Sequence, residues 1–339
     1  FGIWIEPEMV CEDSDLYREH PDWAFTIPGR KPVRARYQLV LDYSRKEVVD
    51  GIFAQIAKVL DDTKADYVKM DMNRHLTDVW SKTAGEQNQG AILHRYMLGV
   101  YDFLERLHER YPDLLIEGCS GGGGRFDAGM LYYTPEMWCC VNTDAIERVK
   151  IQYGTSFAYP SCTVGSHVSA VPNHQTGRTT ELATRAAVAM AGSFGYELDL
   201  NLLTEEEKEQ VRAQIKNYHR FEMLIRQGRY YRLTDVWQKK EYAAWEYCRP
   251  DGSEALVTVV TLDTQCNPAT EYVKLRGLGE DKKYRVEVVG MQTDGENVQR
   301  INGTPNAVEP EYFTGAQLVY AGLPVPRLGN EYKSWQVYI

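Results

Sequence analysis

The feature that most constrains this fold is a unit that repeats along residues 1–227. In each unit a short apolar run ends in polar residues, and an amphipathic helical pattern follows. Strands that alternate with helices form parallel sheets, because the helix carries the chain back before the next strand begins. The sequence therefore predicts a parallel sheet with six strands, at residues 1–5, 65–70, 114–118, 137–141, 163–168 and 194–198.

Two of the intervening helices carry clear start signals. Ser44 and Glu47 have the spacing of a capping box, and an apolar stripe at helical spacing follows them. Thr204 and Glu207 repeat the same pattern before a third long helix. We expect both pairs to cap their helices.

Polar residues collect after the predicted strands, which favours a (β/α) barrel, whose site lies at the carboxyl ends of its strands. A doubly wound sheet is the alternative, but no phosphate-binding glycine fingerprint follows a first strand. A closed barrel needs about eight strands, so we expect the first two upstream of residue 1. Residues 229–339 show short strands without a helical stripe, which predicts a C-terminal antiparallel β-sandwich. The fold class is α/β, with domains at 1–228 (barrel strands three to eight) and 229–339.

Composition excludes several classes of function. The formal net charge of −10 disfavours a nucleic-acid partner. No apolar run reaches the roughly 18 residues of a membrane helix. The seven cysteines are odd in number and irregularly spaced, so they predict neither a disulfide framework nor a zinc site. We expect reduced thiols and a cytoplasmic location.

Asp71 is the strongest candidate for chemistry. It ends a predicted strand, and Lys69, Asn73 and Arg74 surround it. A cationic neighbour keeps a carboxylate ionised, which a nucleophile requires. The alternative is a salt-bridged structural aspartate at a strand end.

Two further segments follow predicted strands. The glycine-rich run at residues 119–125 exposes backbone N–H groups to a ligand, or is simply a flexible turn. It lacks the Lys-Ser/Thr ending of a phosphate loop. Residues 142–144 precede a helix that begins near Ala145, so Thr143 or Asp144 is alternatively its N-cap.

The remaining polar residues are less specific. His167 and His174 lack metal-ligand spacing, so we predict no metal. Trp4, Glu6 and Glu8 follow or end the first strand, and they either line a sugar site or are satisfied residues of the barrel rim.

Together these segments resemble the α-galactosidases of glycoside hydrolase family 36. The resemblance covers residues 1 to about 230 in collinear order. It rests on motifs at residues 1–9, 67–74, 119–127, 142–148, 151–155, 167–174 and 194–200.

The resemblance implies a (β/α)8 barrel and retaining hydrolysis of terminal α-galactosides such as raffinose and melibiose. It also implies no metal or organic cofactor, and often a homotetramer. Asp71 matches the family's nucleophile, and Cys119 and Gly121 match positions facing the C2 substituent of the sugar. The positions that match sugar-binding residues are Trp4, Arg36, Lys69, Asn73, Cys119 and Gly121.

The sequence departs from the family pattern at the acid/base. The family has an aspartate, preceded by serine, where this chain has Cys140 and Val141. Valine cannot transfer a proton, so we expect impaired hydrolysis, by the about 10²–10⁴-fold that general acid–base catalysis contributes. Asp144 is a weak alternative acid. Met70 also replaces a tryptophan, and the Asp-Asp-Gly-Trp strand and N-terminal β-domain are expected upstream.

Several functions stay open on this evidence. The first is an α-galactosidase-type enzyme, natural or engineered, in which Val141 reduces turnover. The second is an α-N-acetylgalactosaminidase of the same family. Alternatively the chain is a carbohydrate-binding pseudoenzyme that keeps the pocket without turnover. Transglycosylation needs the same two carboxyl groups and is disfavoured equally.

Overall fold

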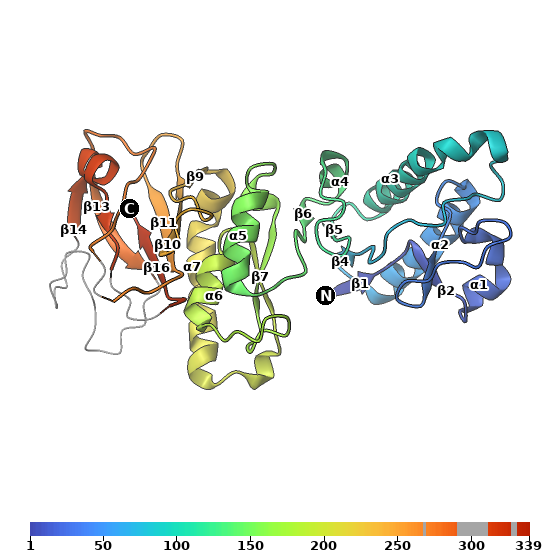
Figure 1. Cartoon of the computed structure of the whole chain (residues 1–339), viewed down its shortest axis with the longest axis horizontal. Helices are drawn as coiled ribbons and strands as arrows, with labels where there is room; N and C mark the ends of the chain where they lie inside the picture. The colour runs from blue at the N-terminus through green and yellow to red at the C-terminus, as the bar shows by residue number, and fades with distance from the viewer. Residues whose placement is uncertain (267–268, 290–310, 327–330) are drawn as a thin grey trace. The chain divides into compact units, whose positions relative to one another are not determined.

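The computed structural model describes residues 1–266, 269–289, 311–326 and 331–339 (Figure 1). Within these residues the chain divides into two compact units, Phe1–Val141 and Asn142–Ile339. Each unit is described by itself below.

The first unit is built on a parallel sheet of four strands in the order β1-β4-β5-β6. The strands are β1 (Gly2–Ile5), β4 (Tyr67–Met70), β5 (Leu115–Gly118) and β6 (Glu136–Met137). The helices that connect them are α2 (Lys46–Thr63), α3 (Ile92–Arg110) and α4 (Ala128–Tyr133). Smaller elements are β2 (Met9–Cys11), α1 (Asp15–Glu19), η1 (Pro21–Trp23), β3 (Gln38–Val40) and η2 (Glu86–Ala91).

The two faces of this sheet have different neighbours because successive strand residues point to opposite sides. Val68, Met70 and Ile116 are buried in one hydrophobic core with the apolar stripes of α2 and α3. The alternate residues, among them Lys69 and Glu117, carry the polar groups of the sheet. Met70, which departs from the family pattern, is therefore a core residue, with 1% of its surface exposed.

Two expectations for this unit are wrong. Ser44 does not cap α2, because its hydroxyl donates to Asp42 while Glu47 accepts from the guanidinium of Arg45. Arg45 occupies the N-cap position and makes no capping bond with its side chain. In place of the strand expected at 137–141, the structure has only β6, which ends at Met137.

The second unit begins with helical segments around one parallel strand pair. The strands β7 (Gly165–Ser169) and β8 (Ser193–Glu197) pair in parallel. The helices are α5 (Ala145–Thr155), α6 (Leu182–Ala189) and α7 (Glu205–Gln227), with short turns η3 (Ser161–Thr163) and η4 (Leu200–Leu202). Thr204 and Glu207 form the predicted capping box at the start of α7, so this expectation is confirmed.

Antiparallel strands follow α7. A six-stranded sheet has the order β14-β13-β16-β11-β10-β9, and β12 pairs with β15 in a second, two-stranded sheet. The bounds are β9 (Arg229–Arg232), β10 (Tyr242–Cys248), β11 (Ala255–Thr261), β12 (Tyr272–Val273), β13 (Lys283–Val289), β14 (Glu311–Thr314), η5 (Gln317–Ala321), β15 (Leu323–Pro324) and β16 (Ser334–Tyr338).

The six-stranded sheet is covered on both faces. On one face, Val257 and Val259 of β11 share a core with Val273 and Leu323 of the small sheet. On the other face, core residues of β10 and β11 pack with Phe221, Leu224 and Ile225 of α7. Among the described helices, none has the length and apolarity needed to cross a bilayer.

Candidate active site

The register of the parallel sheet brings the polar residues of the first unit into one row. Trp4 of β1 lies opposite Lys69 of β4, and Lys69 lies opposite Glu117 of β5. The next residues on the same face are Glu6, Asp71 and Cys119, at or just beyond the carboxyl ends of the strands. Side chains from distant parts of the sequence therefore gather at this edge of the sheet.

Asp71 is buried, with 6% of its surface exposed, and receives three hydrogen bonds. The indole N–H of Trp4 donates to its Oδ2 at 3.3 Å, and the amide of Asn73 donates to the same oxygen at 2.6 Å. The backbone N–H of Gly121 donates to Oδ1 at 3.2 Å. Donors aimed at both oxygens fix the orientation of the carboxylate.

Glu6 links two other candidate residues to this carboxylate. Its Oε1 accepts a hydrogen bond from the Asn73 amide at 2.8 Å and forms an ion pair with Arg36 Nη1 at 2.6 Å. Asn73 thus bridges Glu6 and Asp71. The guanidinium of Arg36 remains half exposed, so it can still reach a ligand.

Glu8 has a different, structural role. Both of its carboxylate oxygens pair with the guanidinium of Arg125 at 2.8 Å, and the hydroxyl of Tyr96 donates to it as well. Glu8 is fully buried. This geometry confirms the interpretation of Glu8 as a satisfied rim residue.

Lys69 is held by a second set of contacts. Its ammonium group pairs with Glu117 at 2.8 Å and lies 4.4 Å from the ring centroid of Trp138. The hydroxyl of Tyr67 also donates to Glu117. Glu117, Trp138 and Tyr67 are not among the site residues predicted from the sequence. Their signal is positional, because each lies in or directly after a strand of the same sheet.

The glycine-rich loop joins Asp71 to the end of the first unit. Gly122 has φ +95°, and a Cβ placed on it would lie 3.0 Å from Cys140 Cα and 3.1 Å from Val141 N. The backbone of residues 140–141 therefore packs directly on Gly122, while the neighbouring Gly121 holds Asp71. Only glycine combines this backbone conformation with this close approach.

The Cys119 thiol lies under this loop and accepts a hydrogen bond from Gly122 N–H at 3.4 Å. Burial, together with the nearby Asp71 charge, raises the pKa of Cys119 to about 12. Cys119 therefore stays protonated near neutral pH and acts as a small, weakly polar wall of the site.

Val141 contributes an apolar side chain with 46% of its surface exposed. It has no group that gains or loses a proton. The structure thus places an exposed hydrophobic residue beside the loop that holds Asp71, where the resemblance predicts an acid.

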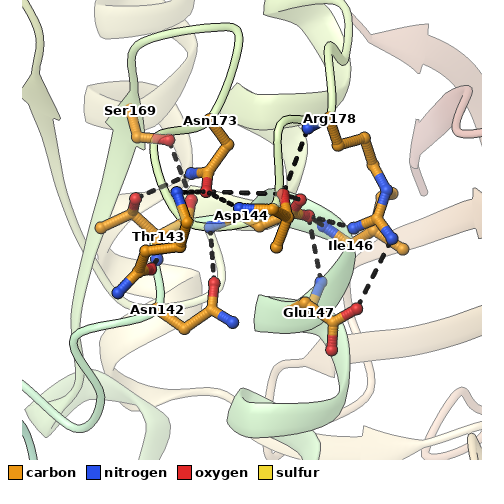
Figure 2. Close-up of polar contacts among 10 residues, drawn as sticks. Asn142, Thr143, Asp144, Ile146, Glu147, Ser169, Asn173 and Arg178 are labelled. Carbon is orange, nitrogen blue, oxygen red and sulfur yellow. Dashed lines mark hydrogen bonds and ion pairs between the residues drawn. The ribbon is translucent and has the colours of Figure 1, made fainter.

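Asp144 lies at the start of the second unit and is the N-cap of α5, which confirms that interpretation (Figure 2). Its Oδ1 accepts from the backbone N–H groups of Ile146 at 2.8 Å and Glu147 at 3.3 Å. Arg178 pairs with the same carboxylate at 2.6 Å, and Thr176 donates to Oδ2. Burial acts to raise the pKa of Asp144, but these hydrogen bonds outweigh it and lower the pKa below the usual range.

Neighbouring contacts hold the same segment in place (Figure 2). Ser169 donates to the carbonyl of Thr143 at 2.9 Å, and the Asn173 amide donates to the Thr143 hydroxyl at 2.9 Å. A carboxylate fixed in this way and paired with a cation is a poor proton donor.

The structure thus brings Trp4, Arg36, Lys69, Asp71, Asn73, Cys119 and Gly121 to one edge of the first unit. In the described part of the chain, no group of three or more His, Cys, Asp and Glu residues is arranged to hold a metal ion. All seven cysteines lie in that part, and none of them forms a disulfide.

A parallel sheet that presents a buried aspartate and its donors at the carboxyl ends of its strands defines an acidic site of the (β/α)-barrel class. Comparison with known families makes this specific. Residues 1–228 match the melibiase family, and residues 242–339 match the glycosyl hydrolase family 36 C-terminal domain. The chain belongs to glycoside hydrolase family 36.

Two characterised relatives cover nearly the whole chain. It is 55% identical over 336 residues to the bifunctional alpha-galactosidase/sucrose kinase AgaSK of Mediterraneibacter gnavus, covering 99% of this chain and 33% of AgaSK. It is 44% identical over 334 residues to the alpha-galactosidase AgaA of Geobacillus stearothermophilus, covering 98% of this chain and 43% of AgaA. The chain therefore spans less than half the length of these relatives.

Solved structures agree with the fold. The galactosidase domain of AgaSK superimposes with a TM-score of 0.87 at 54% identity, covering 100% of this chain and 43% of that one. A variant of AgaA in complex with raffinose superimposes with a TM-score of 0.89 at 43% identity. The match covers 99% of this chain and 44% of the AgaA chain. The predicted fold class, a TIM barrel followed by an antiparallel β-domain, is thereby confirmed.

The AgaA variant with raffinose and a further AgaA variant with stachyose each have a different aspartate replaced. One complex holds raffinose and the other stachyose, and the aspartates replaced in them lie 70 positions apart. In this chain, Asp71 and Val141 are also 70 positions apart.

Proposed function

We propose that this chain carries the site of a retaining α-galactosidase-type glycoside hydrolase in which Asp71 is the nucleophile. The observation that carries this proposal is the buried Asp71 carboxylate at a strand end, held by Trp4, Asn73 and Gly121. A nucleophile must be aimed at one point, and these three donors hold the carboxylate in one orientation.

We further propose that Val141 occupies the place of the acid/base. Its 70-residue separation from Asp71 equals that of the two aspartates replaced in the sugar complexes of AgaA. Its contact with Gly122, next to the Gly121 that holds Asp71, supports the same assignment. A retaining site needs two carboxyl groups about 5–5.5 Å apart, one as nucleophile and one as acid/base, so this site lacks its proton-transferring group. Asp144 is a weak substitute, because it already caps α5 and pairs with Arg178.

The proposed substrates are terminal α-galactosides of the raffinose and melibiose type. Raffinose and stachyose occupy variants of AgaA. Trp4, Arg36, Lys69 and Asn73 are the proposed sugar-binding residues, because they surround Asp71 and offer indole, cationic and amide groups. Cys119 and Gly121 would set the C2 preference, and a shift toward α-N-acetylgalactosamine would be decided there.

A carbohydrate-binding protein without turnover is the second candidate, and the exposed, apolar Val141 favours it. We also propose a cytoplasmic homotetramer without metal or cofactor, because cysteines that form no disulfide suit a reducing compartment. The proposed domain boundary near residue 228 agrees with the two family matches.

Azide rescue separates the two candidates. The longest natural protein that contains this chain is incubated with 4-nitrophenyl α-galactoside, with and without azide. An enzyme that lacks its acid/base forms the galactosyl-enzyme, because nitrophenolate leaves without a proton, and azide then releases α-galactosyl azide. Asp71→Asn is the control and should abolish both products. Measurable galactose binding with no nitrophenolate under either condition would leave only the binding protein.

A further inference from the structure

We propose that this site transfers its galactosyl group to thiols and so forms α-thiogalactosides, an activity that rests on the proposed function. The starting point is the exposed, apolar Val141 beside the loop that holds Asp71. The side chain of residue 141 offers an acceptor neither a base to activate it nor a negative charge to repel it.

The neighbouring carboxylates of the first unit do not replace that base. Glu6 pairs with Arg36 and accepts from Asn73. Glu117 pairs with Lys69. Glu8 is fully buried against Arg125. Each of these three carboxylates is therefore already held by a cationic side chain of the same unit.

The first step needs no proton when the leaving group is a stable anion. A carboxylate oxygen of Asp71 attacks the anomeric carbon, a C1–O bond to Asp71 forms, and the C1–O bond to the aryl group breaks. The electron pair of that bond leaves with the aryl oxygen as a phenolate. Asp71 is oriented for this attack by Trp4 and Asn73.

The second step selects the acceptor. Water and alcohols need a base to remove their proton as they attack C1, and the site offers none at residue 141. A thiolate arrives already deprotonated. Its sulfur forms a C1–S bond, the C1–O bond to Asp71 breaks, and the carboxylate recovers its electron pair. Two inversions at C1 leave the α configuration.

The thiol of Cys119, beside Asp71, does not intercept the intermediate. Cys119 is buried, with 3% of its surface exposed, and burial raises its pKa to about 12. It therefore remains a neutral thiol and leaves the intermediate to external thiolates.

The test uses 4-nitrophenyl α-galactoside as donor, with thiophenol as acceptor and phenol as its matched oxygen control. The protein is the longest natural one that contains this chain. We expect phenyl α-thiogalactoside in about tenfold or greater excess over free galactose, and no phenyl galactoside from phenol. In Val141→Asp the ratio of thiogalactoside to galactose should fall at least about tenfold, because water regains its base. Asp71→Asn should give neither product.

The outcomes separate the inference from the function beneath it. If azide yields galactosyl azide but thiophenol yields no thiogalactoside, the galactosyl-enzyme exists and thiol transfer is overturned. If azide, water and thiophenol all fail to release nitrophenolate, the proposed function fails, and thiol transfer fails with it. Equal transfer to phenol and thiophenol would show that a base is present and would also overturn the inference.

Discussion

At the scale of single residues, Asp71, the proposed nucleophile, shows how a carboxylate becomes ordered at the end of a strand. Its partners are Trp4 in β1, Asn73 two residues further along the chain, and Gly121 in the glycine-rich loop, so three segments must be in place at once. Mutating any one donor removes only part of this orientation. On the proposed function, the valine at position 141 removes proton transfer altogether.

Restoring the acid tests that statement directly. Val141→Asp should raise the hydrolysis of raffinose by about 10²–10⁴-fold, the usual contribution of general acid–base catalysis. Hydrolysis of 4-nitrophenyl α-galactoside should gain less at its first step, because its leaving group needs no proton. Galactose release is the measurement, and Val141→Asn is the control of similar size. No gain with raffinose in Val141→Asp would contradict the assignment of residue 141.

At the scale of elements, sequence patterns predicted the strands and helices better than their ends. The capping box at Thr204 forms, but the one at Ser44 does not, because Asp42 and Arg45 compete for its two members. Such competition is not visible in spacing alone. The strand at 137–141 shortened to β6 because its residues leave the sheet to pack on Gly122.

The candidate site was also predictable only in part, because several of its contacts depend on how distant strands pair. Asp71 follows a strand, which sequence shows, and the resemblance supplied its role. Its link to Glu6 through Asn73 depends on the pairing of β1 with β4, which no local pattern specifies. Glu117 and Trp138 were missed because their significance comes only from their contacts with Lys69.

The glycine loop gives a prediction at this scale. Gly122→Ala should destabilise the fold by about 3 kcal/mol or more, since it adds a Cβ clash to a left-handed backbone. Gly177→Ala is the matched control, because Gly177 also has a positive φ, +71°, but its Cβ would meet nothing within 4 Å. Its cost should be about 1 kcal/mol. Urea unfolding measures both, and equal costs would refute the close contact.

The N-cap of α5 gives another. Asp144→Ala should cost about 2–4 kcal/mol, because it removes a helix cap and leaves Arg178 without its buried partner. Glu147→Ala, which removes the longer, more exposed contact to Arg178 at 3.6 Å, should cost less than about 1 kcal/mol. Thermal unfolding of the two variants should show this order, and the reverse order would contradict it.

At the scale of the whole molecule, two buried carboxylates make the stability of the fold depend on pH in opposite directions. The pKa of Asp144 is lowered in the folded state, so its contribution is present above the unfolded pKa and is lost as pH falls. Glu246 in β10 is fully buried, and burial raises its pKa to about 8, although a hydrogen bond from Arg276 N–H opposes the shift. Within the described residues, its Oε1 has no partner.

The raised pKa of Glu246 therefore predicts that the protein loses stability at alkaline pH. Because its folded pKa is raised, its contribution is fully present below about pH 4.5 and is lost as pH rises to about 8. Glu246→Gln should leave stability at about pH 5 little changed and raise it at about pH 9, on the order of 3 kcal/mol. Urea unfolding at both pH values measures this. A gain of equal size at both values would mean that the charge of Glu246 is not the cause.

The packing of residues 140–141 against Gly122 also has an evolutionary consequence. Because glycine contacts the backbone there, the path of the chain at residue 141 is fixed by its neighbour and is independent of the side chain at that position. Some valine codons become aspartate codons by a single base change. On the proposed function, a lineage could therefore exchange hydrolysis for galactosyl transfer to thiols by one point mutation that leaves the loop unchanged. The reverse mutation would restore hydrolysis.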